Sequence, residues 1–199
     1  MSRFDKVRIA ILKDETLWKG WSHFRRIVFD YIRPDDSKVK LTWEVFDRGE
    51  AVAILLYDPQ RRVVVMVRQF RIPVYLMGSH PFLLEVPAGS MEQGEDAAET
   101  VCREAMEETG YRVDQPRHLF SAYTSPGAVT EKVHFYFAQI NAEQKVADGG
   151  GLAEEHEDIE IVEVSLDAAL AMVGDGRICD AKTIMLLQWA ALNPAALSA

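Results

Sequence analysis

The N-terminal part of the chain contains short stretches in which apolar and polar side chains alternate. In residues 39–45 the apolar positions Val39, Leu41, Trp43 and Val45 fall on one side of an extended chain, with polar residues between them. This pattern predicts a half-buried strand over residues 38–45. Residues 23–32 are expected to form its hairpin partner, because the turn-forming residues 34–37 separate the two stretches.

Two stretches that are almost continuously apolar follow, at residues 51–57 and 62–70. Such stretches are typical of central strands that are buried on both faces, and the turn residues Asp58-Pro59-Gln60 separate them. Residues 71–81 contain two prolines and a glycine and are predicted to be a loop. Further strands are predicted at residues 82–86, 118–123, 132–139 and 158–164.

The pattern becomes helical at residues 95–109, where apolar side chains recur every three or four positions. Gly110 is placed to end this helix in a left-handed conformation. Helices are also predicted at residues 166–173 and 181–192, and a mobile loop at 141–156, which contains three consecutive glycines. This order predicts an α/β sandwich, a mixed sheet with helices against it. An N-terminal antiparallel β segment, residues 1–48, is expected to precede the domain formed by residues 49–199.

Composition and charge narrow the possible functions. The chain has 199 residues, of which 48% are hydrophobic, and this is enough for one core. The formal charge of −9 argues against general binding of nucleic acids, and an acidic protein that handles phosphates usually needs metal ions. Cys102 and Cys179 have no partner at zinc-ligand spacing and are interpreted as reduced packing residues. No signal peptide or stretch of about 20 apolar residues is apparent, so a soluble cytoplasmic protein is predicted.

A cluster of acidic residues on the first predicted helix carries the candidate chemistry. Residues 89–111 follow the pattern G-x5-E-x7-R-E-A-x-E-E-x-G-Y. On a helix Glu104 and Glu108 lie one turn apart, with Glu107 on the same side, so three carboxylates are crowded together. A divalent cation would stabilise this arrangement. The alternative is an acidic helix face that is simply exposed to solvent. Two features argue against it: Arg103 can orient a carboxylate, and the backbone of the glycine-containing loop before the helix can approach a ligand closely.

The same segment resembles the signature of the Nudix hydrolase family. All seven fixed positions match, and only Ala105 and Tyr111 depart mildly from the larger aliphatic residues usual there. The resemblance implies a Nudix α/β/α sandwich and Mg²⁺-dependent hydrolysis of a pyrophosphate bond, with Mn²⁺ as a possible substitute. It also implies metal ligation by Glu104, Glu108 and the backbone carbonyl of Ala88. Glu107 and Arg103 would be catalytic residues together with Glu108, and Glu95 and Glu107 would support the cluster.

A second resemblance concerns the substrate. Ser125-Pro126-Gly127 resembles the family branch that hydrolyses ADP-ribose and other nucleotide sugars, and a tight turn is expected there in any case. From Lys13 to Trp189 the chain is most similar to members that hydrolyse GDP-mannose to GMP and mannose 1-phosphate. Hydrolysis of ADP-ribose to AMP and ribose 5-phosphate is the alternative. A catalytically silent nucleotide-sugar sensor would be expected to lose part of the glutamate cluster, which this chain retains.

The resemblance also assigns substrate and metal contacts to individual residues. It implies that Glu157 is a metal ligand and the general base, although Glu155 is an alternative base. In a homodimer with shared active sites, substrate bound to the other subunit would be contacted by Trp21, Thr42, Trp43 and Glu44. The remaining implied substrate contacts are Arg71, Ala88, Gly89, Ser90, Glu108, Glu131, His156, Glu157 and Lys182.

Overall fold

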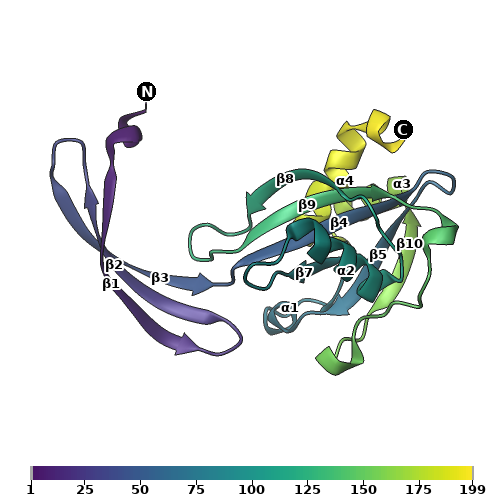
Figure 1. The fold of residues 1–199 in the computed structure, drawn as a ribbon, viewed down its shortest axis with the longest axis horizontal. Coiled ribbons are helices and arrows are strands. Elements are labelled where there is room, and N and C mark those ends of the chain that lie inside the picture. The colour runs from purple at the N-terminus through teal and green to yellow at the C-terminus, as the bar shows by residue number, and fades with distance from the viewer. Residues whose placement is uncertain (1, 199) are drawn as a thin grey trace. The chain divides into compact units, whose positions relative to one another are not determined.

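The computed structural model describes residues 2–198, apart from the side chain of Glu155, and divides them into two compact units (Figure 1). Unit 1 consists of residues Met1–Glu50 together with Tyr123–Lys132. Unit 2 consists of Ala51–Ala122 and Val133–Ala199. Each unit has its own secondary structure.

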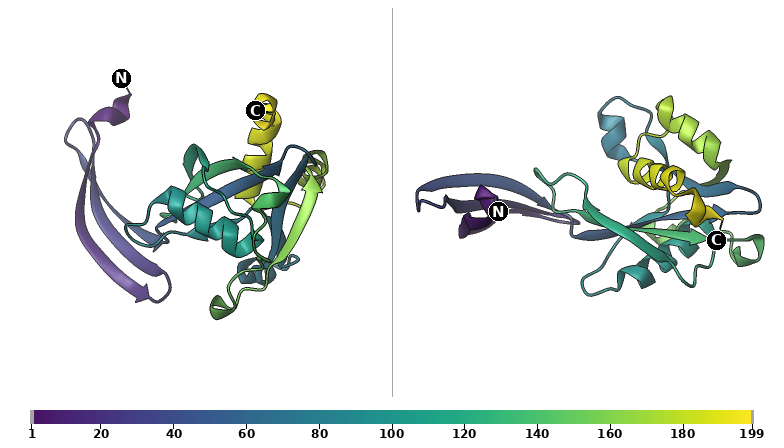
Figure 2. Two further views of the ribbon diagram at one scale, coloured as in Figure 1. Left: turned by 45° about the vertical axis from the view of Figure 1, so that its right-hand side comes forward. Right: turned by 90° about the horizontal axis from the view of Figure 1, so that it is seen from above.

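Unit 1 is built on a three-stranded antiparallel sheet in the order β1-β2-β3. The strands are β1 (Arg8–Lys19), β2 (His23–Ile32) and β3 (Lys38–Asp47), and a short 3-10 helix, η1 (Arg3–Lys6), precedes them. Figure 2 shows the long, curved ribbons of these strands. The predicted hairpin of residues 23–32 with 38–45 is therefore correct.

Strand β1 was not expected from the sequence. Its pairing with β2 is interrupted by register shifts between Ile11 and Lys13 and between Thr16 and Trp18. Each shift changes which face the following side chains point to, so no clean alternation of apolar and polar residues extends along the strand. The N-terminal sheet consequently has one more strand than the predicted hairpin.

Unit 2 contains a seven-stranded sheet with the main order β10-β5-β4-β9-β8, while β6 pairs with β5 and β7 with β4. The predicted central strands are central, since β4 and β5 lie inside the sheet and their middle residues are buried. The short strand β7 was not predicted. The strands are β4 (Glu50–Asp58), β5 (Val63–Phe70), β6 (Phe82–Glu85), β7 (Ala88–Ser90), β8 (Arg117–Tyr123), β9 (Lys132–Gln139) and β10 (Glu160–Ser165).

Helices cover both faces of this sheet, as the view from above shows (Figure 2). One core lies under α2 (Ala97–Thr109) and contains Val52, Ile54 and Val101. The other lies under α3 (Leu166–Gly174) and α4 (Ala181–Leu192) and contains Leu186 and Leu187. The expected α/β sandwich with a mixed sheet, preceded by an antiparallel β segment, is confirmed.

Two helix predictions need correction. Residues 72–76, predicted to lie in a loop, form the short helix α1 (Ile72–Leu76), because Pro73 is tolerated in a first helical turn, where no backbone N–H is required. Helix α2 begins at Ala97 rather than at residue 95, because the Asp96 side chain accepts hydrogen bonds from the N–H groups of Ala98 and Glu99 and so fixes the N-terminus. Gly110 ends α2 with φ +74°, as predicted.

The loop at residues 141–156 contains two short 3-10 helices, η2 (Ala142–Gln144) and η3 (Ala153–Glu155), and a fourth, η4 (Pro194–Leu197), follows α4. Both cysteines are free, but only Cys102 packs against a core, whereas Cys179 is exposed. The interpretation of Cys179 as a packing residue is therefore wrong. Within residues 2–198 no helix is long and apolar enough to cross a membrane, and the cytoplasmic location stays a prediction.

Candidate active site

Helix α2 carries three glutamates of the motif, Glu104, Glu107 and Glu108. Val101 and Ala105 are fully buried against the sheet, which fixes the rotation of the helix about its axis. Glu108 is buried with only 2% of its surface exposed, and Glu104 is half-buried. The deep burial of Glu108 was not expected from the sequence, which indicated only that it shares one side of the helix with Glu104 and Glu107.

The environment of these carboxylates disfavours their charged forms. Burial raises the pKa of Glu104 to about 7, with repulsion from Glu107 and Glu157 adding to the effect and Arg103 opposing it. Burial likewise raises the pKa of Glu108 well above its usual value, although the N–H of Ala88 donates a hydrogen bond to Glu108 Oε2 at 3.1 Å. Glu104, Glu108 and Glu157 are thus close enough to repel one another.

Arg103 links the acidic residues on the outer side of α2. Its Nη1 lies 3.0 Å from Glu104 Oε1 and 3.0 Å from Glu107 Oε2, and its Nη2 lies 3.9 Å from Glu95 Oε2. Glu95 itself accepts hydrogen bonds from the backbone N–H of Glu92 and from the hydroxyl of Thr100. The orienting role expected for Arg103 is compatible with these contacts.

Gly89 lies against the Glu104 carboxylate. A Cβ atom on Gly89 would be 2.0 Å from Glu104 Cδ, so only a glycine lets the carboxylate lie over strand β7. The neighbouring Ala88 pairs with Ala53 in β4, and Ser90 is exposed at the end of β7. Strand β7 therefore brings Ala88 and Gly89 to the carboxylate cluster, since the Ala88 N–H contacts Glu108 and Gly89 lies against Glu104.

The glycine-rich segment connects this cluster to Glu157. The N–H groups of Gly150 and Gly151 donate hydrogen bonds to the carbonyls of Glu108 and Glu107, at 2.9 and 3.0 Å. The Glu157 carboxylate accepts a hydrogen bond from the N–H of Leu152 at 3.1 Å. His156 is exposed and has φ +58°. The alternative base, Glu155, lies outside the side chains that the structure describes.

The donor chemistry of this cluster fits a hard divalent cation. Glu104, Glu108 and Glu157 offer carboxylate oxygens, and their mutual repulsion is the kind that such a cation relieves. Among residues 2–198, no three His, Cys, Asp or Glu side chains already converge on one cation-sized point. Instead, each carboxylate is held by Arg103 or by a backbone N–H, so its orientation would have to change to receive a cation.

A second charged group in unit 2 contains Arg71 and Lys182. Arg71 donates two hydrogen bonds to Glu85, and the Lys182 ammonium donates one to Asp180. Although burial opposes the rise, attraction to Glu85 and to Glu108 raises the pKa of Arg71. Because Glu108 is close enough to have this effect, Arg71 adjoins the carboxylate cluster. Glu85 and Asp180 were not identified from the sequence. A signal existed for Glu85, which is a charged residue directly after the apolar stretch of β6.

The expected contact residues of unit 1 form two groups. The Arg48 guanidinium lies 4.0 Å from the centroid of the Trp21 ring, and its Nε lies 3.9 Å from Glu131 Oε1. Arg48 thus connects Trp21 with Glu131, and it was not identified from the sequence. Thr42 and Glu44 are exposed side chains of β3.

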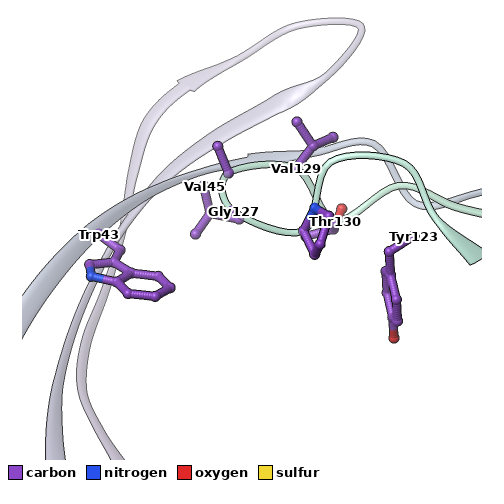
Figure 3. Close-up of a pocket in the computed structure, with 8 residues that line it drawn as sticks. Trp43, Val45, Tyr123, Gly127, Val129 and Thr130 are labelled. Carbon is purple, nitrogen blue, oxygen red and sulfur yellow. The ribbon is translucent and has the colours of Figure 1, made fainter. Parts of the chain in front are cut away.

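Trp43, the remaining contact residue expected in unit 1, lines a pocket of about 480 Å³. Figure 3 shows its ring and that of Tyr123 on opposite sides of the turn that carries Gly127 and Thr130. The expected tight turn is present, since Val129 N–H donates a hydrogen bond to the Ser125 carbonyl at 2.9 Å. Tyr123, like Arg48, was not identified from the sequence.

Comparisons with known proteins agree on one family. A family model described as NUDIX domain matches residues 47–187. A GDP-mannose pyrophosphatase of Yersinia enterocolitica is 45% identical over 94% of this chain and 97% of its own length. One from Klebsiella pneumoniae is 40% identical over 92% of this chain and 91% of its own length. A crystal structure of an ADP compounds hydrolase has the same fold, with a TM-score of 0.71, 20% identity and coverage of 92% and 95% of the two chains.

Proposed function

The chain belongs to the Nudix hydrolase family, and from that membership we propose that it hydrolyses the pyrophosphate bond of GDP-mannose to give GMP and mannose 1-phosphate. The observation that carries this proposal is the similarity, across almost the whole chain, to two GDP-mannose pyrophosphatases. The carboxylate cluster on α2 supports hydrolysis rather than silent binding, because all of its members are present. The likeness to the ADP compounds hydrolase is a likeness of fold.

Nudix hydrolases typically depend on a divalent metal ion, and we propose Mg²⁺ for this chain. Its ligands would be Glu104, Glu108, Glu157 and the backbone carbonyl of Ala88. A bound Mg²⁺ would neutralise negative charge on the diphosphate and would make a water molecule bound to it more acidic than bulk water. Gly89 leaves the space in which the Glu104 carboxylate lies, and Arg103 contacts the carboxylates of both Glu104 and Glu107.

The other residues of the site would bind substrate and move a proton. Glu157 would accept the proton of the attacking water. The hydrogen bonds of Gly150 and Gly151 to the carbonyls of Glu108 and Glu107 hold the preceding loop against α2. Arg71 and Lys182 would bind the phosphate oxygens, because Arg71 is a cation next to the carboxylate cluster and Lys182 contacts the same Glu85 as Arg71. Contacts from Gly89, Ser90, His156 and Glu131 would complete the binding of the substrate.

A hydrolysis panel tests the substrate. GDP-mannose, ADP-ribose, ADP-mannose and IDP-ribose are compared at equal concentration with and without Mg²⁺, and kcat/KM is measured for each. We expect the highest value for GDP-mannose, products that co-elute with GMP and mannose 1-phosphate, and no turnover after chelation. A higher kcat/KM for ADP-ribose would contradict the proposed substrate, and metal-independent turnover would contradict the proposed cofactor.

We also propose that two copies of the chain form a homodimer with shared active sites. In unit 1, large apolar side chains expose more than half of their surface, including Ile9, Ile11, Trp18 and Trp43. In unit 2, the side chains of Tyr75 and Leu76 in α1 and of Met77, the residue after α1, are also exposed. Packing against a second copy would remove such surfaces from water. Residues 1–48 would then contact substrate in the partner's site through Trp21, Thr42, Trp43 and Glu44.

A mixing experiment tests the shared sites. Glu108→Gln chains, which have a normal N-terminal sheet, are coexpressed with chains carrying Thr42→Ala and Glu44→Ala, which have a normal carboxylate cluster. Two different affinity tags allow the heterodimer to be isolated. We expect both parents to be inactive and the heterodimer to recover activity in one of its two sites. A monomeric mass at micromolar concentration, or a verified heterodimer without activity, would refute the arrangement.

A further inference from the structure

Glu85 is a buried carboxylate at the end of β6 with a cation on either side. Only 2% of its side chain is exposed. Its Oε1 accepts a hydrogen bond from Arg71 Nε, and its Oε2 accepts one from Arg71 Nη2, both at 2.9 Å. The ammonium of Lys182 lies 3.7 Å from Oε2. One buried side chain therefore contacts both of the cations to which phosphate binding was assigned above.

The strand register shows how this contact shapes Arg71. Glu85 lies opposite Val67 in the β5–β6 pairing, whereas Arg71 follows Phe70, the last residue of β5. The arginine side chain must therefore fold back along the strand to reach Glu85. A bidentate contact of this kind fixes the plane of the guanidinium group. Its Nη1 makes no hydrogen bond to the part of the protein that the structure describes, which leaves this nitrogen available to a ligand.

Lys182 is held from the other side by the N-terminus of α4. Its ammonium donates a hydrogen bond to Asp180 Oδ1 at 2.8 Å, and Asp180 Oδ2 accepts hydrogen bonds from the N–H and the hydroxyl of Thr183. The Thr183 hydroxyl in turn accepts a hydrogen bond from Val86 N–H, the residue after Glu85. The two cations and two carboxylates thus form one network, with balanced charge, between β6 and α4.

A buried charge pair is weak evidence of a stabilising role, because the cost of desolvation offsets much of the attraction. An apolar residue would fill the same position without that cost. What a carboxylate provides here, and an apolar residue does not, is a fixed orientation for two cations that approach from different elements.

We propose that Glu85 is a positioning residue, which holds Arg71 and Lys182 in the arrangement that binds the diphosphate of the substrate. The inference rests on the proposed function, since it takes both cations to be phosphate contacts. Glu85 itself is too deeply buried to touch the substrate. Its role is therefore exerted through the two cations.

The test replaces Glu85 by glutamine in the full-length protein. Glutamine has the same shape but no charge, and its amide nitrogen cannot accept a hydrogen bond from Arg71. We expect KM for GDP-mannose to rise at least about 10-fold while kcat changes less than about threefold, because binding common to the ground state and the transition state is lost. Inhibition by GMP should weaken by a similar factor, whereas inhibition by guanosine, which has no phosphate, should not change.

Asp58→Asn is the matched control. Asp58 is another buried carboxylate of unit 2, with 3% of its side chain exposed and its Oδ2 2.6 Å from Arg61 Nε, but it is the last residue of β4 and contacts neither Arg71 nor Lys182. We expect its replacement to lower the thermal midpoint without changing KM. If Glu85→Gln yields no folded protein, Glu85→Asp serves instead, because its shorter side chain keeps the charge but cannot contact both cations. For either variant a rise in KM supports the proposal.

Combination with Arg71→Ala shows whether Glu85 acts through the cation. In that background Glu85→Gln should raise KM further by less than about threefold, because most of the interaction is already absent. The proposal is overturned by an unchanged KM in a folded Glu85 variant, or by equal weakening of inhibition by GMP and by guanosine. It is also overturned if Glu85→Gln raises KM by the same factor in the Arg71→Ala background as in the wild type. If the wild type prefers another substrate in the panel, the proposed function is wrong, and the same KM comparison is made with that substrate.

Discussion

Replacing either Glu104 or Glu108 by glutamine is expected to reduce kcat at least about 100-fold, because each replacement removes a proposed metal ligand. Burial and neighbouring carboxylates raise the pKa of both groups. A carboxyl group whose pKa is higher in the folded state than in the unfolded state destabilises the fold when it is ionised. A neutral glutamine avoids that cost, so we expect the metal-free variants to be at least as stable as the wild type at pH 7.

Three measurements check this expectation: kcat at saturating Mg²⁺, the Mg²⁺ concentration that gives half-maximal activity, and the thermal midpoint in the presence of a chelator. Glu99→Gln is a suitable control, since Glu99 is an exposed glutamate in the first turn of the same helix. Its replacement should leave all three measurements nearly unchanged. Normal turnover with normal metal dependence in either the Glu104 or the Glu108 variant would remove the basis for the proposed site.

Replacing Gly149 by alanine is expected to lower the free energy of unfolding by about 3 kcal/mol. Gly149 has φ +72°, a conformation that costs other residues about 1–2 kcal/mol. In addition, a Cβ atom would lie 2.6 Å from the backbone C of Thr109 and 2.7 Å from the N of Gly110. Because these are backbone atoms at the end of α2, relief requires the loop to move and weakens the hydrogen bonds of Gly150 and Gly151, at about 1 kcal/mol each.

Gly176→Ala separates the two contributions. Gly176 has a similar φ of +83°, but nothing lies within 4 Å of the position its Cβ would occupy. We therefore expect only the conformational cost of about 1–2 kcal/mol from this replacement. Urea unfolding of both variants measures the difference. Equal destabilisation would show that the loop moves freely and that the backbone contacts of Gly149 contribute little.

The elements that the sequence predicted correctly are those whose signals are local. The bounds of β2, β9 and α4 agree with the predicted ranges. Helix α4, for example, begins directly after its capping residue, Asp180. Strand β1 was missed because its bulges change the phase of the pattern. Helix α1 was missed because proline and glycine in residues 71–81 favour a loop, although Pro73 can occupy a first helical turn.

By itself, the sequence determined the family and the helix that carries the carboxylates. A spacing of four residues brings Glu104 and Glu108 together in any α-helix, so no distant contact had to be known. Tertiary structure alone decided how deeply Glu108 is buried and that Arg48 lies between Trp21 and Glu131. It also decided that Glu85 contacts both Arg71 and Lys182. These contacts join residues far apart in the chain, and they depend on strand register and on the packing of helices, which local periodicity does not specify.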